Sequence, residues 1–237
     1  MTRGILICGN KSSLFSAAAA EAAKRVEVFA SVQIPHRFPT PGGRVDPMPQ
    51  EETAGGAIPL SWNPASPISA RTLVLAAENR LERINDAVLV CSPPAVFKTA
   101  ETLMPQEIDI LVNDEIKGWF FLIRELALYF RRAGAGSLSL VMPEINTGNS
   151  SFKSGSNAWG KNTPVDLLGP ASLASFQSFS QSVIASSDNV PYQVMGFTGY
   201  EAGSETEFVS WLFKIIDECS GKNSGRWHRY SKLRLFR

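Results

Sequence analysis

The side chains best placed for chemistry stand directly after short apolar runs. Gly9, Lys11 and Ser12 follow the run at residues 5–8 and precede a segment that favours a helix. A turn that leads into a helix N-terminus presents backbone N–H groups to an anion, and a lysine adds positive charge. The turn therefore indicates a phosphate-binding site, although a solvated turn in which Ser12 caps the helix is the simpler interpretation.

Other polar side chains are predicted to meet in the same crevice, because the carboxyl ends of parallel strands lie at one edge of a sheet. They are Asn10, Ser92, Asn113, Glu144, Asn146, Thr198 and Tyr200. Glu144 could act as a base, but neither His36 nor His228 is placed to assist it. The sequence has no Ser-His-Asp, metal-ligand or Walker-type arrangement, so no metal site is expected.

Composition excludes several classes of protein. The chain has 237 residues, three widely spaced cysteines and a formal net charge of +1. Its length fits one domain, and its charge gives no reason to expect nucleic-acid binding. It has no apolar stretch long enough for a membrane span and no signal-peptide pattern, and its cysteines form no disulfide framework. We therefore expect a soluble cytoplasmic protein with free thiols.

Apolar runs alternate with segments of helical periodicity along the whole chain. Strands are predicted at residues 4–8, 26–32, 57–62, 86–91, 138–142, 192–197 and 226–230. Helices are predicted from the Ser12 cap to residue 25, from a Ser69 cap to residue 84, and over residues 115–132, 170–186 and 205–219. This alternation predicts one doubly wound α/β domain with a parallel sheet in three layers. Irregular insertions are expected at residues 35–56 and 146–168.

The order of these landmarks resembles the short-chain dehydrogenase/reductase family, a Rossmann-type fold that binds NAD or NADP. Residues 86–91 resemble its fourth strand, the segment around Asn113 resembles the one with its catalytic Asn, and residues 136–142 resemble its fifth strand. The resemblance implies the strand order 3-2-1-4-5-6-7 and a homodimer or homotetramer through the helices at 115–132 and 170–186. The wide apolar faces of these helices favour the same assembly.

The cofactor motif departs from the family's pattern. With the family's first glycine laid on Gly9, its second and third glycines become Ser13 and Phe15. Those glycines let the backbone approach the cofactor's diphosphate and let the helix pack closely on the strand. Phe15 is therefore expected to fill space that the cofactor or the first helical turn needs.

The catalytic motif departs as well. The chain contains no Tyr-x-x-x-Lys, and the family's Tyr position falls on Gly169 or Pro170. The family's Ser after the fifth strand is replaced by Pro143-Glu144. Of the catalytic set Asn113 remains, and the resemblance implies a structural role for it as well as a catalytic one.

Two hypotheses of function follow. In the first, the chain has lost NAD(P) binding and catalysis, holds no cofactor, and acts as a binding or scaffold protein with an unknown protein partner. In the second, it is an NAD(P)-dependent oxidoreductase with displaced groups: Gly9, Lys11 and Ser12 bind the cofactor, Asn113 is a hydrogen-bond partner and Tyr200 acts as the acid.

Two further segments leave alternatives open. Residues 146–164 are rich in Gly, Ser and Asn, which fits a lid or partner-binding loop as well as a simple insertion. The basic and aromatic residues that alternate after residue 222 could bind nucleic acid. Alternation at period two favours an edge strand whose charges deter pairing with another chain.

Overall fold

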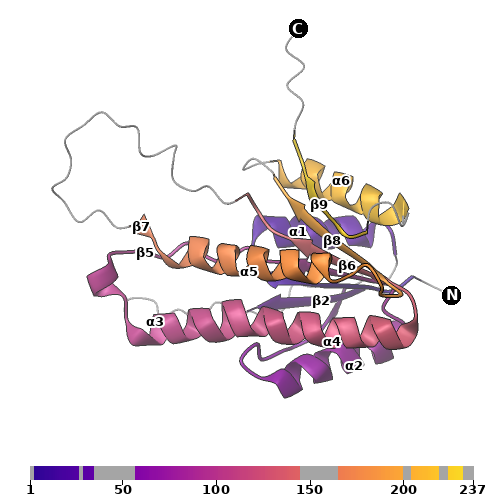
Figure 1. Ribbon diagram of the computed structural model, residues 1–237, viewed down its shortest axis with the longest axis horizontal. Coiled ribbons are helices and arrows are strands. Elements are labelled where there is room, and N and C mark those ends of the chain that lie inside the picture. Colours follow the sequence, from indigo (N-terminus) through magenta and orange to yellow (C-terminus); the bar gives the residue numbers. More distant parts are fainter. Residues whose placement is uncertain are drawn as a thin grey trace, which may run out of the picture.

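A computed structural model of the protein describes residues 3–26, 29–34, 57–144, 165–199, 204–218 and 224–231. Its centre is a seven-stranded parallel sheet in the order β3-β2-β1-β4-β6-β8-β9 (Figure 1). The strands are β1 (Ile5–Asn10), β2 (Phe29–Ile34), β3 (Ala57–Pro59), β4 (Asp86–Val90), β6 (Ser137–Val141), β8 (Gln193–Thr198) and β9 (Arg226–Arg229). Counted along the chain, this is the predicted order 3-2-1-4-5-6-7, with the last strand at the edge. The predicted strand order and the predicted edge position of the last strand are both confirmed.

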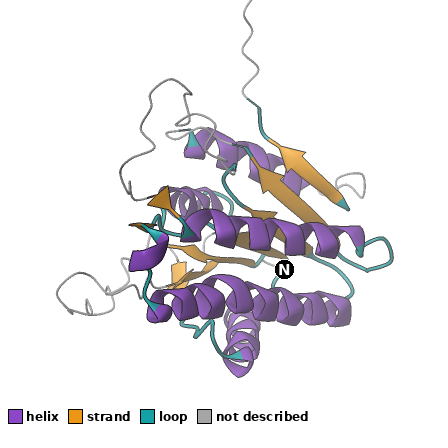
Figure 2. Ribbon diagram, turned by 60° about the vertical axis from the view of Figure 1, so that its left-hand side comes forward, coloured by secondary structure: helices purple, strands orange, loops and turns teal. Residues whose placement is uncertain are grey.

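Helices cover both faces of the sheet (Figure 2). On one face lie α1 (Ser13–Ala23) and α6 (Glu205–Glu218). On the other lie α2 (Pro67–Leu81), α4 (Gly118–Ala133) and α5 (Leu168–Ala185). The three layers confirm the predicted Rossmann-type α/β architecture.

Strand β1 shows why the central strands are apolar at every position. Leu6 and Cys8 pack under α2, α4 and α5, whereas Ile5 and Ile7 pack under α1 and α6. Successive side chains of a strand point to opposite faces, so a strand covered on both sides must be apolar throughout. The two helical layers thus share one buried sheet.

The second helix begins earlier than predicted. Its N-cap is Ser66, whose hydroxyl accepts a hydrogen bond from the backbone N–H of Ser69. The prediction of Ser69 as the cap is wrong: its hydroxyl accepts from the backbone N–H of Asn63 instead. Pro67 explains the earlier start, because proline is favoured in the first helical turn, where its missing N–H costs nothing.

The helix predicted at 115–132 is the end of a longer helical stretch. It starts as α3 (Pro105–Ile110), continues through the π-helical segment η2 (Leu111–Lys117) and ends as α4. A single π turn inside an α-helix rotates the side chains that follow it, and such turns are frequent at functional sites. Here the turn holds Asn113, Asp114 and Glu115.

Smaller elements complete the fold. A 3₁₀ turn, η1 (Ala100–Thr102), precedes α3, and β5 (Phe97–Lys98) pairs antiparallel with β7 (Val165–Asp166). The predicted insertions at 35–56 and 146–168 lie outside the described residues, except for 165–168, which form β7 and begin α5. No helix in the described ranges is both long and apolar enough to cross a lipid bilayer.

Candidate functional site at the carboxyl edge of the sheet

The turn between β1 and α1 is filled by an aromatic ring. Ser12 caps α1 as predicted, its hydroxyl accepting from the Phe15 backbone N–H at 3.1 Å. The Phe15 side chain is 2% exposed and packs directly on Gly9: a Cβ added to Gly9 would lie 2.7 Å from Phe15 Cδ2 and 2.8 Å from the carbonyl oxygen of Val90. Phe15 therefore occupies the space between the first turn of α1 and the end of β1.

A carboxylate stands at the same helix end. The Ser13 hydroxyl donates a hydrogen bond of 3.0 Å to Glu205 Oε1, from the first turn of α6. The Lys11 side chain is exposed beside this turn. The positive end of the α1 dipole thus has an acidic side chain of the protein itself nearby.

Asn10, the last residue of β1, organises the buried part of the crevice. Its side chain is fully buried, and Nδ2 donates to both carboxylate oxygens of Glu115, at 2.8 and 2.9 Å. Its Oδ1 accepts from the backbone N–H of Ser92 at 2.8 Å. One amide therefore ties the end of β1 to the segment after β4 and to the π-helical turn.

Glu115 is a buried acid of the crevice, with 3% of its surface exposed, and its neighbour Asp114 is buried to the same extent. Burial raises the pKa of its carboxyl group to about 7, and the charge of Asp114 acts in the same direction. The hydrogen bond from Asn10 opposes this rise because it stabilises the charged form. Glu115 therefore changes its protonation state near neutral pH.

The neighbouring thiol is not activated. Burial, and then the charge of Glu115, raise the pKa of Cys91 well above its ordinary value, although Ser172 of α5 and Trp119 of α4 lie beside the sulfur. The nucleophilic form of cysteine is the thiolate, so Cys91 stays a neutral buried thiol. Helix α5 adds no acid or base, because its sequence contains neither Tyr nor Lys.

The structure brings together only part of the predicted site. Gly9, Lys11 and Ser12 form the turn before α1. Asn113 lies in the π-helical turn, where its Oδ1 accepts from Lys117 Nζ at 3.1 Å on the surface. Tyr200 lies outside the described residues.

Two other residues of the predicted site are Asn146 and Glu144. Asn146 lies outside the described residues. Glu144 is exposed and forms an ion pair with Arg229 of β9. This ion pair ties Glu144 to the end of β9.

Sequence reasoning missed Glu115. The signal available was an acidic pair, Asp114-Glu115, at the start of a helix that is otherwise strongly apolar. Both acids are buried, and a regular helix does not specify which of them meets Asn10. The π turn decides that Glu115 meets Asn10, and nothing in the sequence marked the turn.

Comparison with solved structures places this fold among short-chain dehydrogenases/reductases. An NADH-dependent reductase, A1-R', complexed with NAD shares 13% identity at a TM-score of 0.67, over 97% of this chain and 95% of that one. A short-chain dehydrogenase from Bacillus anthracis matches equally well, with 12% identity, a TM-score of 0.67 and 97% and 95% of the two chains covered.

A short-chain dehydrogenase from Mycobacterium smegmatis shares 11% identity at a TM-score of 0.65, over 98% of this chain and 93% of that one. No family model and no curated protein matches the sequence. The chain therefore has the fold of these enzymes, while its sequence shares 11–13% identity with theirs.

Proposed function

We propose that this chain is a non-catalytic protein on the fold of short-chain dehydrogenases/reductases, which has lost NAD(P) binding and hydride transfer and acts as a binding or scaffold protein. The observation that carries the proposal is the filled turn at the end of β1, where the Phe15 ring lies on Gly9. A diphosphate needs close backbone approach at this turn. The Phe15 ring fills the space that a diphosphate would need for this approach.

Charge supports the same conclusion. Glu205 reaches the N-terminus of α1 through Ser13, so a negative group already stands where a phosphate would gain from the helix dipole. Two like charges at this distance repel each other, and the diphosphate would also lose water on entering. The residues present at this turn do not fit a dinucleotide.

Among the described residues, the reacting end of the crevice lacks a set of groups placed for general acid–base catalysis. Helix α5 offers no Tyr or Lys, Cys91 is a neutral thiol, and the Glu115 carboxylate is enclosed with the Asn10 amide. A general acid or base must lie within hydrogen-bond reach of the proton that it transfers. Both carboxylate oxygens of Glu115 instead accept hydrogen bonds from the Asn10 side chain.

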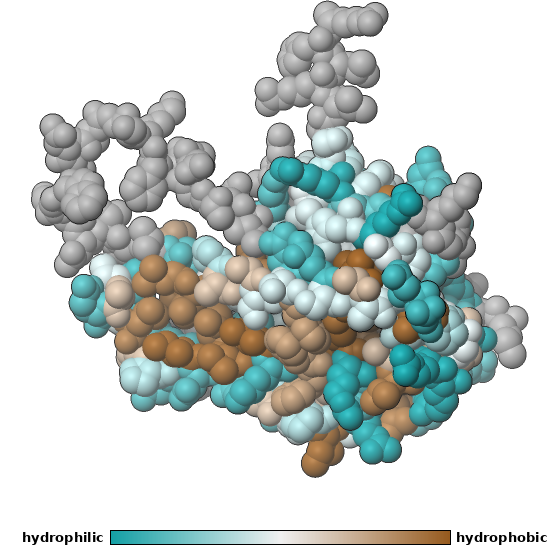
Figure 3. All heavy atoms as spheres, viewed as in Figure 1, coloured by the Kyte–Doolittle hydropathy of each residue, from teal (hydrophilic) through white to brown (hydrophobic). Residues whose placement is uncertain are grey.

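A second copy of the chain is the partner that we propose for the face formed by α4 and α5. Hydrophobic side chains gather over these helices (Figure 3). Phe120 is 39% exposed and stacks on Phe179 at 3.8 Å between ring centroids, and Leu128 is 51% exposed. An apolar patch of this kind marks an interaction surface, so we expect a homodimer or homotetramer.

The assembly is tested by sedimentation of Leu128→Glu against Leu75→Glu, a matched change at an exposed leucine of α2. We expect the first variant to lower the mass in solution and the second to leave it unchanged. A wild-type monomer at micromolar concentration would contradict the proposed assembly.

A cytoplasmic location belongs to the same proposal and fits the buried free thiols Cys8 and Cys91.

Titration with NADH and NADPH tests the loss of cofactor binding. A ligand at a hundred times its Kd adds about 2.7 kcal/mol to the free energy of unfolding, which is easily seen as a rise in Tm. We expect no rise with either nucleotide at millimolar concentration. A rise, or hydride turnover, would contradict the proposal.

A matched pair of variants tests whether the side chains of Ser13 and Phe15 exclude the nucleotide. Ser13→Gly together with Phe15→Gly restores both glycines, and we expect this variant to gain a response to NADH. Leu14→Gly removes a buried side chain from the same helical turn without opening the end of β1. It controls for the loss of core packing and should gain no response.

The second candidate is an NAD(P)-dependent oxidoreductase. The likeness of the whole chain to a reductase complexed with NAD favours it. In this case Gly9, Lys11 and Ser12 hold the nucleotide, and Asn113 and Tyr200 supply the catalytic hydrogen bond and the acid. A nucleotide-dependent rise in Tm that Lys11→Ala abolishes would select this function over the first.

A further inference from the structure

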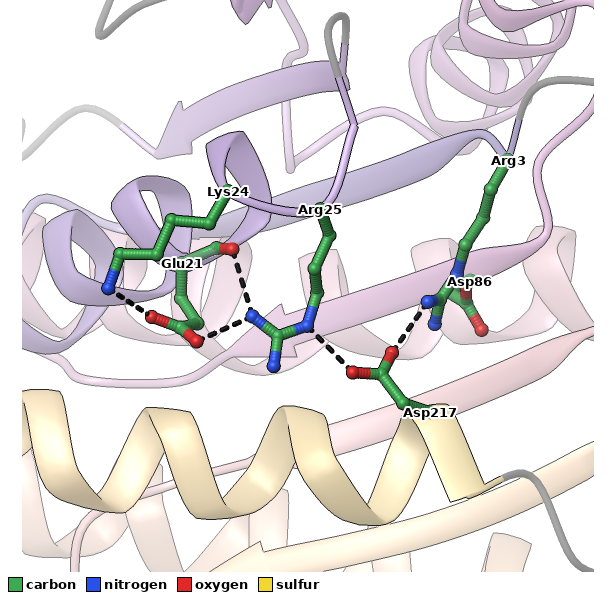
Figure 4. Close-up of polar contacts among 6 residues, drawn as sticks. All are labelled: Arg3, Glu21, Lys24, Arg25, Asp86 and Asp217. Carbon is green, nitrogen blue, oxygen red and sulfur yellow. Dashed lines mark hydrogen bonds and ion pairs between the residues drawn. The ribbon is translucent and has the colours of Figure 1, made fainter.

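The acidic side chains that are buried among the described residues are Glu21, Asp86, Glu107, Asp114 and Glu115. The first three are held by cations, and Figure 4 draws two of these networks: the ion pairs are Glu21 with Lys24 and Arg25, Asp86 with Arg3, and Glu107 with Lys98. A buried carboxylate is costly to keep charged unless an opposite charge offsets the loss of water. Glu115 has no ion pair in the described ranges, and its carboxyl group lies beside the neutral side chains of Asn10 and Trp119.

The described elements around Glu115 supply no cation to its carboxyl group. On η2, Asp114 is a second acid, and Lys117 bonds Asn113 at the surface. Strand β1 ends in a neutral amide, β4 leads into the neutral thiol of Cys91, and α5 contains no titratable side chain. The other charged groups in the adjoining parts of α3, α4 and the turn after β1 are exposed or paired with each other: Lys11, Asp109, Glu107 with Lys98, and Arg124 with Glu125.

The contact between Asn10 and Glu115 therefore favours the protonated carboxyl group. In this contact the pKa of Glu115 is about 7, whereas a carboxyl group that has moved into water has its ordinary pKa of 4.5. The contact is fully favoured below pH 4.5 and weakens as the pH rises to 7, because the charged group gains more from water than from a neutral amide.

The π-helical turn gives Glu115 a way to leave this contact. In η2 the Gly118 backbone N–H bonds the carbonyl of Asn113, five residues earlier, instead of the carbonyl four residues earlier. A return to the α-helical register shifts the chain by one residue, which rotates the residues on one side of the turn by about 100°. A rotation of this size takes the Glu115 carboxyl group out of its contact with Asn10.

The two sides of the turn are anchored unequally. Helix α4 begins at Gly118, where an added Cβ would lie 2.6 Å from Pro64 Cβ, and it continues with the buried side chains of Trp119 and Leu122. In α3 the buried residue is Glu107, and the rest of that helix is at least partly exposed. Rotation of α3 and η2 therefore disturbs less buried surface than rotation of α4.

We propose that the Asn10–Glu115 contact is a pH-sensitive latch: the protonated Glu115 carboxyl group holds η2 against the end of β1, and the ionised carboxylate leaves this contact so that α3 and η2 open. Asn10 also accepts a hydrogen bond from the backbone N–H of Ser92, so the opening loosens the segment after β4 as well. The latch needs no nucleotide, so it is independent of the function proposed above.

Hydrogen exchange of the full chain from pH 5 to 8, followed by mass spectrometry, tests the latch. After correction for the intrinsic exchange rate, we expect the protection of residues 105–117 to fall at least about tenfold over this range and to level off above pH 7. Residues 119–133 of α4 are the internal reference. In about 1 M urea their exchange should rise, because it requires global unfolding, whereas the exchange of residues 105–117 should stay the same.

Glu115→Gln keeps an acceptor for Asn10 but cannot ionise, so residues 105–117 of this variant should be equally protected at pH 5 and pH 8. Asp109→Asn, at an exposed acid of α3, is the matched control and should keep the pH dependence of the wild type. Three results would each overturn the proposal: protection of residues 105–117 that does not change with pH, an equal response of both segments to urea, or an unchanged pH dependence in Glu115→Gln. If Glu115→Gln does not fold, the two measurements on the wild type decide.

Discussion

At the amino edge of the sheet, the Asp86 carboxylate is held by the Arg3 guanidinium and the Ser137 hydroxyl, whereas at the carboxyl edge the Glu115 carboxylate is held by the neutral Asn10 amide. Both acids are buried, and they lie beside opposite ends of the same central strands. A buried charge is costly unless an opposite charge offsets the loss of water. The amino edge supplies that charge, and the carboxyl edge supplies only dipoles.

This difference separates a charged wall from a crevice in which the acid is easily neutralised. In the proteins of similar fold, the carboxyl edge is the expected ligand side, because open parallel sheets bind ligands there. In this chain that edge is filled by Phe15 and by the Asn10–Glu115 pair. A cavity of about 740 Å³ lies at the other edge.

The largest effect is expected from the glycine at the amino end of β1. A Cβ added to Gly4 would lie 2.0 Å from the backbone oxygen of Arg83, which cannot move without shifting the chain. Gly4→Ala should therefore lower the free energy of unfolding by more than about 3 kcal/mol. Denaturant unfolding of Gly4→Ala and the wild type measures this loss.

Gly9→Ala is the matched change at the carboxyl end of β1. Its Cβ would approach a side-chain atom of Phe15 and the Val90 oxygen at 2.7 and 2.8 Å, so we expect a smaller loss of about 2 kcal/mol. Equal losses at the two positions would contradict the difference in clearance between the two ends of the strand.

Glu115→Gln should remove a pH dependence. The pKa of Glu115 is raised from 4.5 to about 7 in the folded chain, so its protonated form favours folding below pH 4.5 and this contribution is lost as the pH rises through 7. At pH 8 the variant should exceed the wild type in free energy of unfolding by up to about 3 kcal/mol.

At pH 4 the ionisation of Glu115 should make no difference between the two proteins. Chemical denaturation from pH 4 to 8 gives both curves. Parallel curves would show that the carboxylate is not desolvated. Asp109→Gln, at an exposed acid of α3, is the control and should run parallel to the wild type.

Asp86→Ala should cost about 2 kcal/mol, because it leaves the buried Ser137 hydroxyl without its acceptor and the partly buried Arg3 with Asp217 as its remaining carboxylate partner. Asp217→Ala removes the other carboxylate that Arg3 contacts, but Asp217 is exposed, so its loss should stay below about 1 kcal/mol. The measurement is denaturant unfolding at low and high salt. A larger loss of free energy of unfolding in Asp217→Ala would show that the contact of Arg3 with α6 stabilises the fold more than its contact with the sheet.

The smallest effect is expected at Glu82, which ends α2 with φ of +60°. This backbone region favours glycine, so Glu82→Gly should stabilise the protein by about 1 kcal/mol. Thermal unfolding checks the sign. A lower Tm would mean that contacts of the Glu82 side chain outweigh the strain of its backbone.

Much of the fold could be predicted from the sequence, because it rests on local patterns. The apolar runs at residues 5–8, 86–91 and 138–142 indicated strands covered on both faces, and Ser12 indicated the cap of α1. The strand order was implied by family resemblance. The cap of α2 was misplaced because Ser66 and Ser69 are both good caps, and Pro67 between them decided the choice.

The sequence by itself determined which residues stand at each strand end, and it put Phe15 in the turn of α1 that follows β1. Only the tertiary structure decided what those residues meet. The π-helical turn brings Glu115 to Asn10, and the close packing of α1 and α6 brings Glu205 to Ser13. These partners are 105 and 192 residues apart along the chain. Contacts over such separations depend on how whole elements pack, and local side-chain patterns do not specify that.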